Sequence, residues 1–147
     1  MVSLSSLLML IHLLGLSLGV GAATVKLILL FKCNSDYGFV PAYLKVTKMI
    51  TKLIILGLVL LTLSGIGWVW LVYPFTPKLI AKLIFVLAIW VIGPIIDNAI
   101  EPKFRELAPA SGEQASPEFV KIQKKLLTLE IIATGLFYLI ILMWILV

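Results

Sequence analysis

A single histidine, His12, lies inside the first of four long apolar segments and is the side chain best suited to chemistry. Neutral imidazole can bind a haem iron or copper, or pass protons. A titratable group is costly to bury in a membrane helix, so it commonly has a function there. His12 could instead be a satisfied core histidine that only hydrogen-bonds a hydroxyl of a neighbouring helix. The sequence leaves both interpretations open.

Two other polar residues are expected at the depth of His12. If both long loops lie on the cytoplasmic side, His12, Ser64 and Lys82 all fall in the outer leaflet. We expect them to line one ligand pocket, in which Lys82 supplies a positive charge for a propionate or another anionic group. Haem held by two histidines of the same chain is excluded, because the chain has only one.

Lys26 and Glu130 form a second candidate pair, toward the inner leaflet. His12 and Lys26 are about 21 Å apart along the helix axis, at 1.5 Å per residue, so they cannot belong to one site. We expect a structural ion pair between Lys26 in the first helix and Glu130 in the last. Lys26 could also extend to the cytoplasmic lipid headgroups, and the pair could belong to a proton or ion path.

The composition identifies the elements that must position these residues. Hydrophobic residues make up 62% of the 147 and charged residues 13%, and the mean hydropathy is +1.18, which leaves too few polar residues to cover a soluble domain. Strand-like alternation is absent, and backbone in lipid must then be helical. We expect an all-α, polytopic membrane protein, a four-transmembrane-helix bundle forming a single transmembrane domain over residues 1–147. The expected helices cover about residues 4–31, 42–73, 78–96 and 117–147.

Prolines and glycines mark the connections between these helices. Pro74 and Pro77 bracket a short link, which makes the second and third helices antiparallel neighbours. The pair Gly93-Pro94 predicts a kink or an early stop near the inner end of the third helix. Residues 103–116 are expected to form a flexible cytoplasmic loop.

The first helix carries a Gly-xxx-Gly motif on the face of His12. Gly15 and Gly19 are four residues apart, and such spacing permits two helices to approach closely. His12 is therefore expected to point toward a packed face rather than toward lipid. The glycines could serve packing within the bundle or between copies of the chain.

The distribution of basic residues predicts the orientation. The net charge is +5. Lysines and arginines are enriched in the cytoplasmic loops of membrane proteins. They concentrate in the two long connections, so we expect both termini outside and both longer loops in the cytoplasm. This charge favours contact with anionic lipid rather than with nucleic acid. The basic residues of the two connections and their flanks are Lys32, Lys45, Lys48, Lys52, Lys103, Arg105, Lys121, Lys124 and Lys125.

Three short motifs resemble a family of small bacterial four-helix membrane proteins. They are His12-Leu-Leu-Gly15 followed by Gly19, Thr62-Leu-Ser-Gly65, and Lys82 at the start of the third helix. The family includes the copper-resistance D domain, HemJ-type protoporphyrinogen oxidases and uncharacterised members, to which this chain is most similar. The resemblance implies a bacterial inner (plasma) membrane location, with His12 and Lys82 as the site residues and haem b or copper as the cofactor.

These observations lead to three functional hypotheses. The first is a non-enzymatic membrane protein that binds a small ligand or ion, or assists a membrane assembly, through an outer-leaflet pocket around His12. The second is a haem-binding membrane oxidoreductase with His12 as the axial metal ligand. The third is a purely structural membrane subunit. The expected partners are the lipid bilayer and either further copies of the chain or other membrane subunits. Signatures of soluble enzymes, such as a phosphate-binding Gly-rich loop, are absent.

Overall fold

The computed structural model describes residues 3–71, 75–110 and 113–145, and most of them are helical. The elements in chain order are α1 (Leu4–Ser35), the 3₁₀ turn η1 (Tyr37–Phe39), α2 (Val40–Leu71), α3 (Pro77–Ile95), the π-helical turn η2 (Ile96–Ile100), α4 (Glu101–Glu106) and α5 (Pro117–Ile145).

Four helical stretches are long and apolar enough to cross a membrane, which confirms the expected all-α class with four spanning helices. They are Leu4–Ser35, Tyr37–Leu71, Pro77–Glu106 and Pro117–Ile145. The expected last residues of the second and fourth helices, 72–73 and 146–147, lie outside the described residues, as does Pro74.

Two helical segments extend beyond the limits expected from the sequence. α1 continues to Ser35, because no proline or glycine interrupts it before the Asp36 side chain accepts a hydrogen bond from the Gly38 N–H. Residues 103–106 belong to α4 rather than to a loop. Phe104 anchors this helix: its side chain is fully buried and packs edge-on against Tyr43 of α2.

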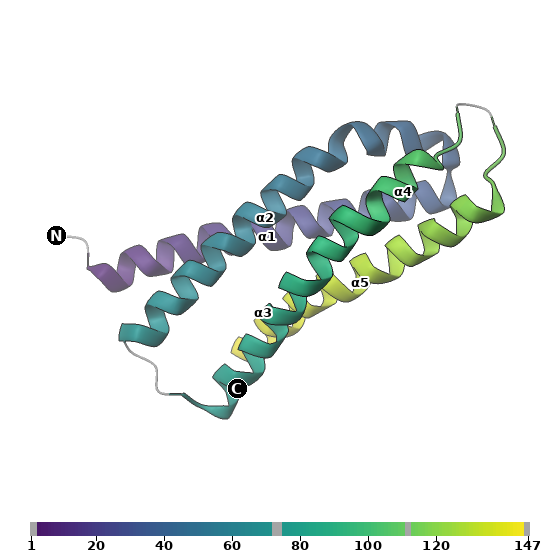
Figure 1. Cartoon of the computed structure of the whole chain (residues 1–147). Coiled ribbons are helices and arrows are strands. Elements are labelled where there is room, and N and C mark those ends of the chain that lie inside the picture. The colour runs from purple at the N-terminus through teal and green to yellow at the C-terminus, as the bar shows by residue number, and fades with distance from the viewer. Residues whose placement is uncertain (1–2, 72–74, 111–112, 146–147) are drawn as a thin grey trace.

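α1 and α2 form a closely packed antiparallel pair, and α3 packs on α5, which also contacts α1 (Figure 1). The α1–α2 contact is close because glycines face one another. A Cβ atom added to Gly57 would lie 2.2 Å from the Gly19 backbone nitrogen, and one added to Gly15 would lie 2.9 Å from Leu61. Gly15 and Gly19 therefore pack against α2 of their own chain.

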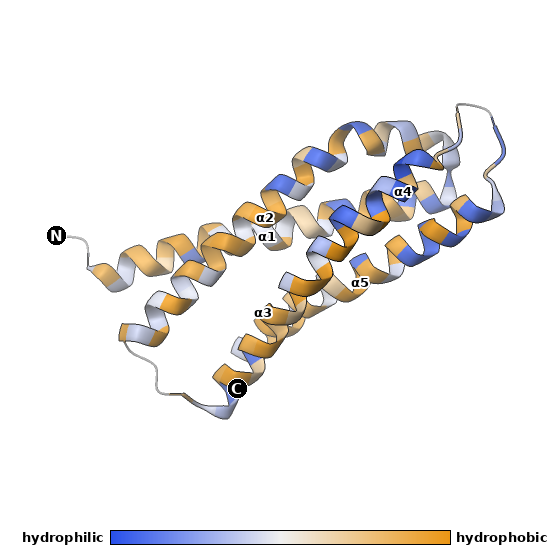
Figure 2. Cartoon of the chain, viewed as in Figure 1, coloured by the Kyte–Doolittle hydropathy of each residue, from blue (hydrophilic) through white to orange (hydrophobic). Residues whose placement is uncertain are grey.

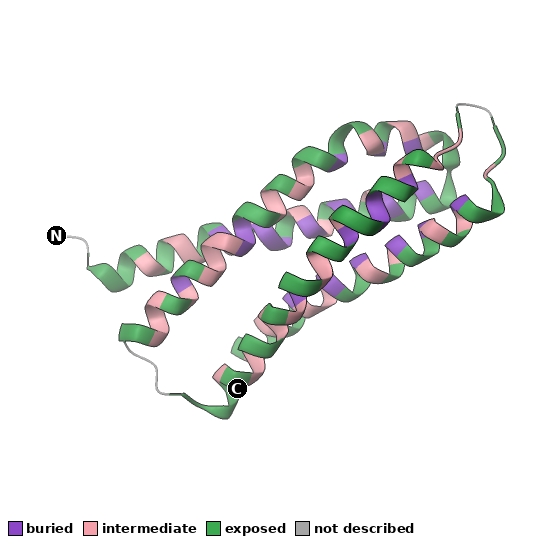
Figure 3. Cartoon of the chain, viewed as in Figure 1, coloured by how far each residue is buried: buried purple, intermediate pink, exposed green. Residues whose placement is uncertain are grey.

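The bundle has two distinct ends. The α1–α2 and α4–α5 connections meet at one end, which we call the loop end, and α1 begins and α5 ends at the opposite, terminal end (Figure 1). Hydrophilic residues gather toward the loop end in Figure 2. Buried residues also concentrate there (Figure 3). In α1 the first buried residue is Gly15, and in α3 the only one is Ile89, so few residues are buried toward the terminal end.

The outer surface of the bundle is apolar, as a spanning protein requires. Ile28, Leu87 and Trp144 are each more than 60% exposed. Such side chains would be unusual in this number on a soluble protein, but they match the hydrocarbon of a bilayer. The chain is a multi-pass membrane protein, and its buried polar side chains lie inside the bundle rather than on this apolar surface.

Candidate functional site

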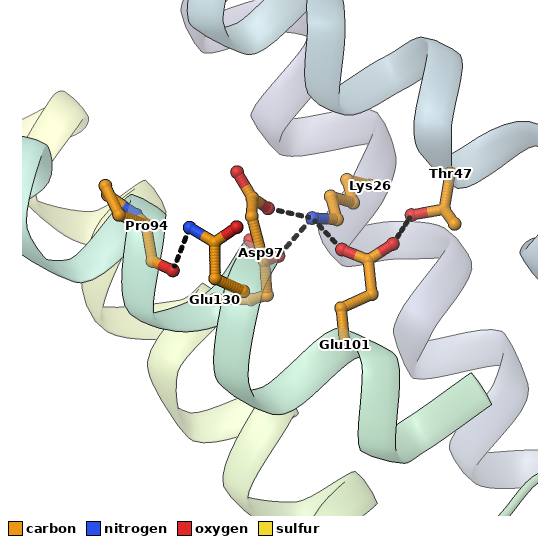
Figure 4. Close-up of polar contacts among 7 residues, drawn as sticks. Lys26, Thr47, Pro94, Asp97, Glu101 and Glu130 are labelled. Carbon is orange, nitrogen blue, oxygen red and sulfur yellow. Dashed lines mark hydrogen bonds and ion pairs between the residues drawn. The ribbon is translucent and has the colours of Figure 1, made fainter. Parts of the chain in front are cut away.

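Lys26 of α1 lies at the centre of a cluster of three carboxylates. Its side chain is 2% exposed, and its Nζ is 2.7 Å from Glu130 Oε1, 3.1 Å from Glu101 Oε2 and 3.7 Å from Asp97 Oδ1. Figure 4 shows the carboxylates converging on this ammonium from η2, the start of α4, and α5. The contact expected between Lys26 and Glu130 is present, and the structure adds two acids that the sequence analysis had not placed there.

The π-helical turn η2 supplies Asp97, and Glu101 follows it directly as the first residue of α4. Pro94 lies inside α3 and has no N–H to continue the α-helical hydrogen-bond ladder. Two residues later the backbone widens, so that the Glu101 N–H bonds to the Ile96 carbonyl five residues back. The Asn98 side chain donates to the Pro94 carbonyl at 3.0 Å. The disturbance expected near Gly93-Pro94 is therefore a π turn that carries the helix onward, a geometry often found at functional sites.

Glu101 is held at both carboxylate oxygens. Lys26 Nζ donates to Oε2, and the hydroxyl of Thr47 on α2 donates to Oε1 at 3.0 Å. Thr47 is fully buried, and Glu101 is 7% exposed. This bond connects the α1–α2 pair to α4, so the cluster joins all four spanning stretches.

The other two carboxylates retain free hydrogen-bonding capacity. Glu130 Oε1 lies 2.7 Å from Lys26 Nζ, and a carboxylate oxygen has a second lone pair that can accept a hydrogen bond from another donor. The Asp97 side chain is 25% exposed and has the longest contact with Lys26. One ammonium thus faces three carboxylates, and the contacts recorded in the described parts of the chain bring no second cation to them.

A cleft of about 260 Å³ opens beside the cluster, with lining residues from all four spanning stretches. Lys26, Asp97 and Glu130 form its polar end, and most of the remaining lining is apolar. The Thr134 hydroxyl, on a residue 3% exposed, lines the cleft and has no hydrogen-bond partner. A buried polar group without a partner is unusual and calls for a ligand or water. This arrangement can accept a hydrogen-bonding group that carries positive charge.

His12 lies far from this cluster and contacts a hydroxyl of α2. Its Nδ1 is 2.9 Å from Ser64 Oγ, and Ser64 is 1% exposed. The Ser64 hydroxyl also lies 2.7 Å from the Leu60 carbonyl, to which it donates. A hydroxyl has one proton, and that of Ser64 is donated to the Leu60 carbonyl. The Ser64 oxygen therefore accepts from the Nδ1–H of His12, and Nε2 is the unprotonated ring nitrogen.

Lys82 does not join His12 and Ser64 in a common contact. Its Nζ lies 4.6 Å from the centre of the Trp144 ring, a cation–π contact between α3 and the last turns of α5. His12 and Ser64 are therefore in direct contact, whereas the contact of Lys82 is with Trp144 of α5. None of the three lines the cleft.

The described residues contain no group of three or more histidine, cysteine, aspartate or glutamate side chains arranged to hold a metal ion. Cys33 is buried and free. The Lys26 cluster is thus an ammonium–carboxylate site rather than a metal centre of that kind.

Comparisons with protein-family models, with curated proteins and with solved structures gave no match. The family resemblance of the three sequence motifs stays a prediction, and the site is interpreted from its own geometry.

Proposed function

We propose that this membrane protein binds a small cation at the cluster of Lys26, Asp97, Glu101 and Glu130. The observation that carries the proposal is the ratio of charges: three carboxylates surround one ammonium at the polar end of a cleft. Unbalanced charge in a buried site is expensive, so the two remaining carboxylates require protons or a cation.

A purely structural ion pair would need fewer groups. Lys26 and Glu130 alone could neutralise one another, and Glu101 is fixed by two donors. Asp97 adds a further acid that is partly exposed and lines the cleft. Its position favours exchange with a ligand over a fixed structural contact.

Proton release tests this proposal. Purified protein in weakly buffered detergent is titrated with methylammonium chloride while a pH-sensitive dye reports released protons. We expect saturable release of up to one proton per protein, because the cation replaces a proton in the cluster. Asp97→Asn and Glu130→Gln should each lower the release at least fivefold.

Glu106→Gln provides the matched control, because Glu106 is an exposed acid of α4 outside the cluster. It should release protons as the wild type does. Absence of release from the wild type with every amine tested would overturn the proposal.

A second candidate function, a haem-binding oxidoreductase, has support from the Ser64–His12 contact. A ligating histidine is commonly oriented by a hydrogen bond to its other ring nitrogen, and Ser64 orients His12 in this way. The cleft does not reach His12, so a haem there would lie against the outer face of the bundle. A Soret band that appears on adding haem and is lost in His12→Ala would support this function; a colourless protein would contradict it.

The orientation that we propose places the loop end in the cytoplasm and both termini outside. The clustering of basic residues at that end supports it, and placement in a bacterial inner membrane rests on the sequence resemblance. Ser116→Cys, in a Cys33→Ser background, should resist a membrane-impermeant maleimide in intact cells and react after lysis. Labelling in intact cells would show that the loop end lies outside, the opposite of the proposed orientation.

A further inference from the structure

We infer that the cation is an amphiphilic amine, with one ammonium on a short apolar body, which enters the cleft from the lipid between α2 and α3. This inference rests on the proposed function and names the class of its ligand. The ammonium would lie against Glu130 and Asp97, and the apolar body would fill the remainder of the cleft.

The lining of the cleft matches such a molecule at both ends. Away from Lys26 and its acids, the walls are formed by Ile54 and Leu58 of α2, Ile89 of α3 and Phe137 of α5. A simple inorganic cation would gain nothing from this apolar part, whereas a hydrocarbon chain is stabilised by leaving water. The volume, about 260 Å³, is slightly below the range of roughly 300–1,000 Å³ for drug-sized ligands, so the body is a short chain or a single ring.

The mouth of the cleft faces the lipid. Ile55 of α2 and Trp90 of α3 both line the cleft, yet they are 45% and 37% exposed. The surroundings of a spanning helix at this depth are acyl chains. Trp90 Nε1–H donates to Thr62 Oγ1 at 3.1 Å and so bridges α3 and α2 beside the opening. A ligand that partitions into the bilayer can therefore reach the acids without crossing the loop end.

Two polar groups are available to the ammonium inside the cleft. Thr134 lies one helical turn after Glu130 on α5, and its hydroxyl is buried without a partner. Glu130 Oε1 retains capacity to accept a hydrogen bond. A primary ammonium has three N–H donors, which these two oxygens and the Asp97 carboxylate can receive.

Gly93 offers a direct way to fill the cleft. It lines the cleft, and a Cβ atom added there would meet nothing within 4 Å. Gly93→Ala should therefore add a methyl group without a clash, and Gly93→Leu should occupy more of the ligand space; alanine also favours a helix over glycine. Gly135→Leu is the matched control: a Cβ at Gly135 also meets nothing within 4 Å, and Gly135 does not line the cleft.

The experiment compares methylammonium with hexylammonium in the proton-release titration, using wild-type protein and the three glycine variants. We expect hexylammonium to bind the wild type at least tenfold more tightly. Gly93→Leu should abolish most of this preference, and Gly93→Ala should lie between Gly93→Leu and the wild type. Gly135→Leu should match the wild type.

The outcomes separate the two proposals. If methylammonium and hexylammonium bind the wild type equally, or if Gly93→Leu leaves the preference for hexylammonium intact, the amphiphilic ligand and its route are wrong while cation binding stands. If neither amine releases protons from the wild type, the proposal of cation binding at the cluster is wrong as well.

Discussion

Lys26 and His12, two ionisable residues of α1, occupy opposite halves of the bundle and are accommodated in different ways. Lys26 lies among buried side chains of every spanning stretch and is surrounded by charged partners. His12 lies nearer the terminal end, where fewer residues are buried, and its Nδ1 contacts the neutral hydroxyl of Ser64 at 2.9 Å. A membrane helix can thus retain a strongly polar group through a dense network or through a single hydrogen bond near the bundle surface. The density of surrounding partners, rather than the residue type, distinguishes the stronger candidate site.

Among the variants that test this difference between the two halves, Lys26→Met should have the largest effect on stability. Removing the ammonium leaves the buried Glu101 and Glu130 and the partly exposed Asp97 without their shared cation, which should lower the free energy of unfolding by about 3–5 kcal/mol. Lys82→Met is the control, because its contact with Trp144 contributes about 0.5–1 kcal/mol. Both are measured by denaturation in mixed micelles. Addition of Glu130→Gln to Lys26→Met should restore part of the loss. Equal, small losses in the two lysine variants would show that the cluster is not a tightly coupled network.

Thr47→Val tests whether the network around Lys26 extends to α2. The change keeps the shape but removes the donor to Glu101 Oε1, and an acceptor left unsatisfied in a buried site costs about 1–3 kcal/mol. The same denaturation assay should show this loss. Thr128→Val serves as its control, because the exposed Thr128 hydroxyl only donates to the Lys124 carbonyl of its own helix. A Thr47→Val protein as stable as the control would limit the network to Lys26 and its acids.

A double-mutant cycle on His12 and Ser64 addresses the opposite half and has the smallest expected effect. Hydrogen bonds between membrane helices average about 0.6 kcal/mol. His12→Ala, Ser64→Ala and the double variant should therefore yield a coupling energy near this value. A coupling above about 2 kcal/mol would exceed the range seen for such bonds and would make the terminal half as tightly organised as the Lys26 cluster.

The sequence was sufficient to predict the helices and part of the polar interior. Backbone in lipid is restricted to helices, so hydropathy alone identifies four spanning stretches. Depth along a helix follows from residue number, which placed Lys26 near Glu130 and His12 near Ser64. The glycine spacing also marked the face on which α1 meets another helix.

The sequence did not reveal that the helical backbone continues beyond residue 96, through η2 into α4. A proline usually indicates a kink or a stop, and the expected third helix, residues 78–96, ends before Asp97 and Glu101. The π turn instead carries both acids to Lys26. Lys82 shows the related difficulty: its depth could be counted from the sequence, but its direction around the bundle depends on tertiary packing with α5.

Lys26 precedes all three of its acidic partners in the sequence, and this order affects insertion of the chain into the membrane. Lys26 is in α1, whereas Asp97, Glu101 and Glu130 are all synthesised after α2 is complete. During translation the α1–α2 hairpin, joined by its facing glycines, must enter the bilayer with an uncompensated ammonium that can only reach toward the headgroups. Arrival of the later helices then draws this charge inward. We expect nascent chains that end after Leu71 to be degraded faster than full-length chains, and Lys26→Met to remove that difference. The network therefore forms only after α5, which carries Glu130, has entered the bilayer.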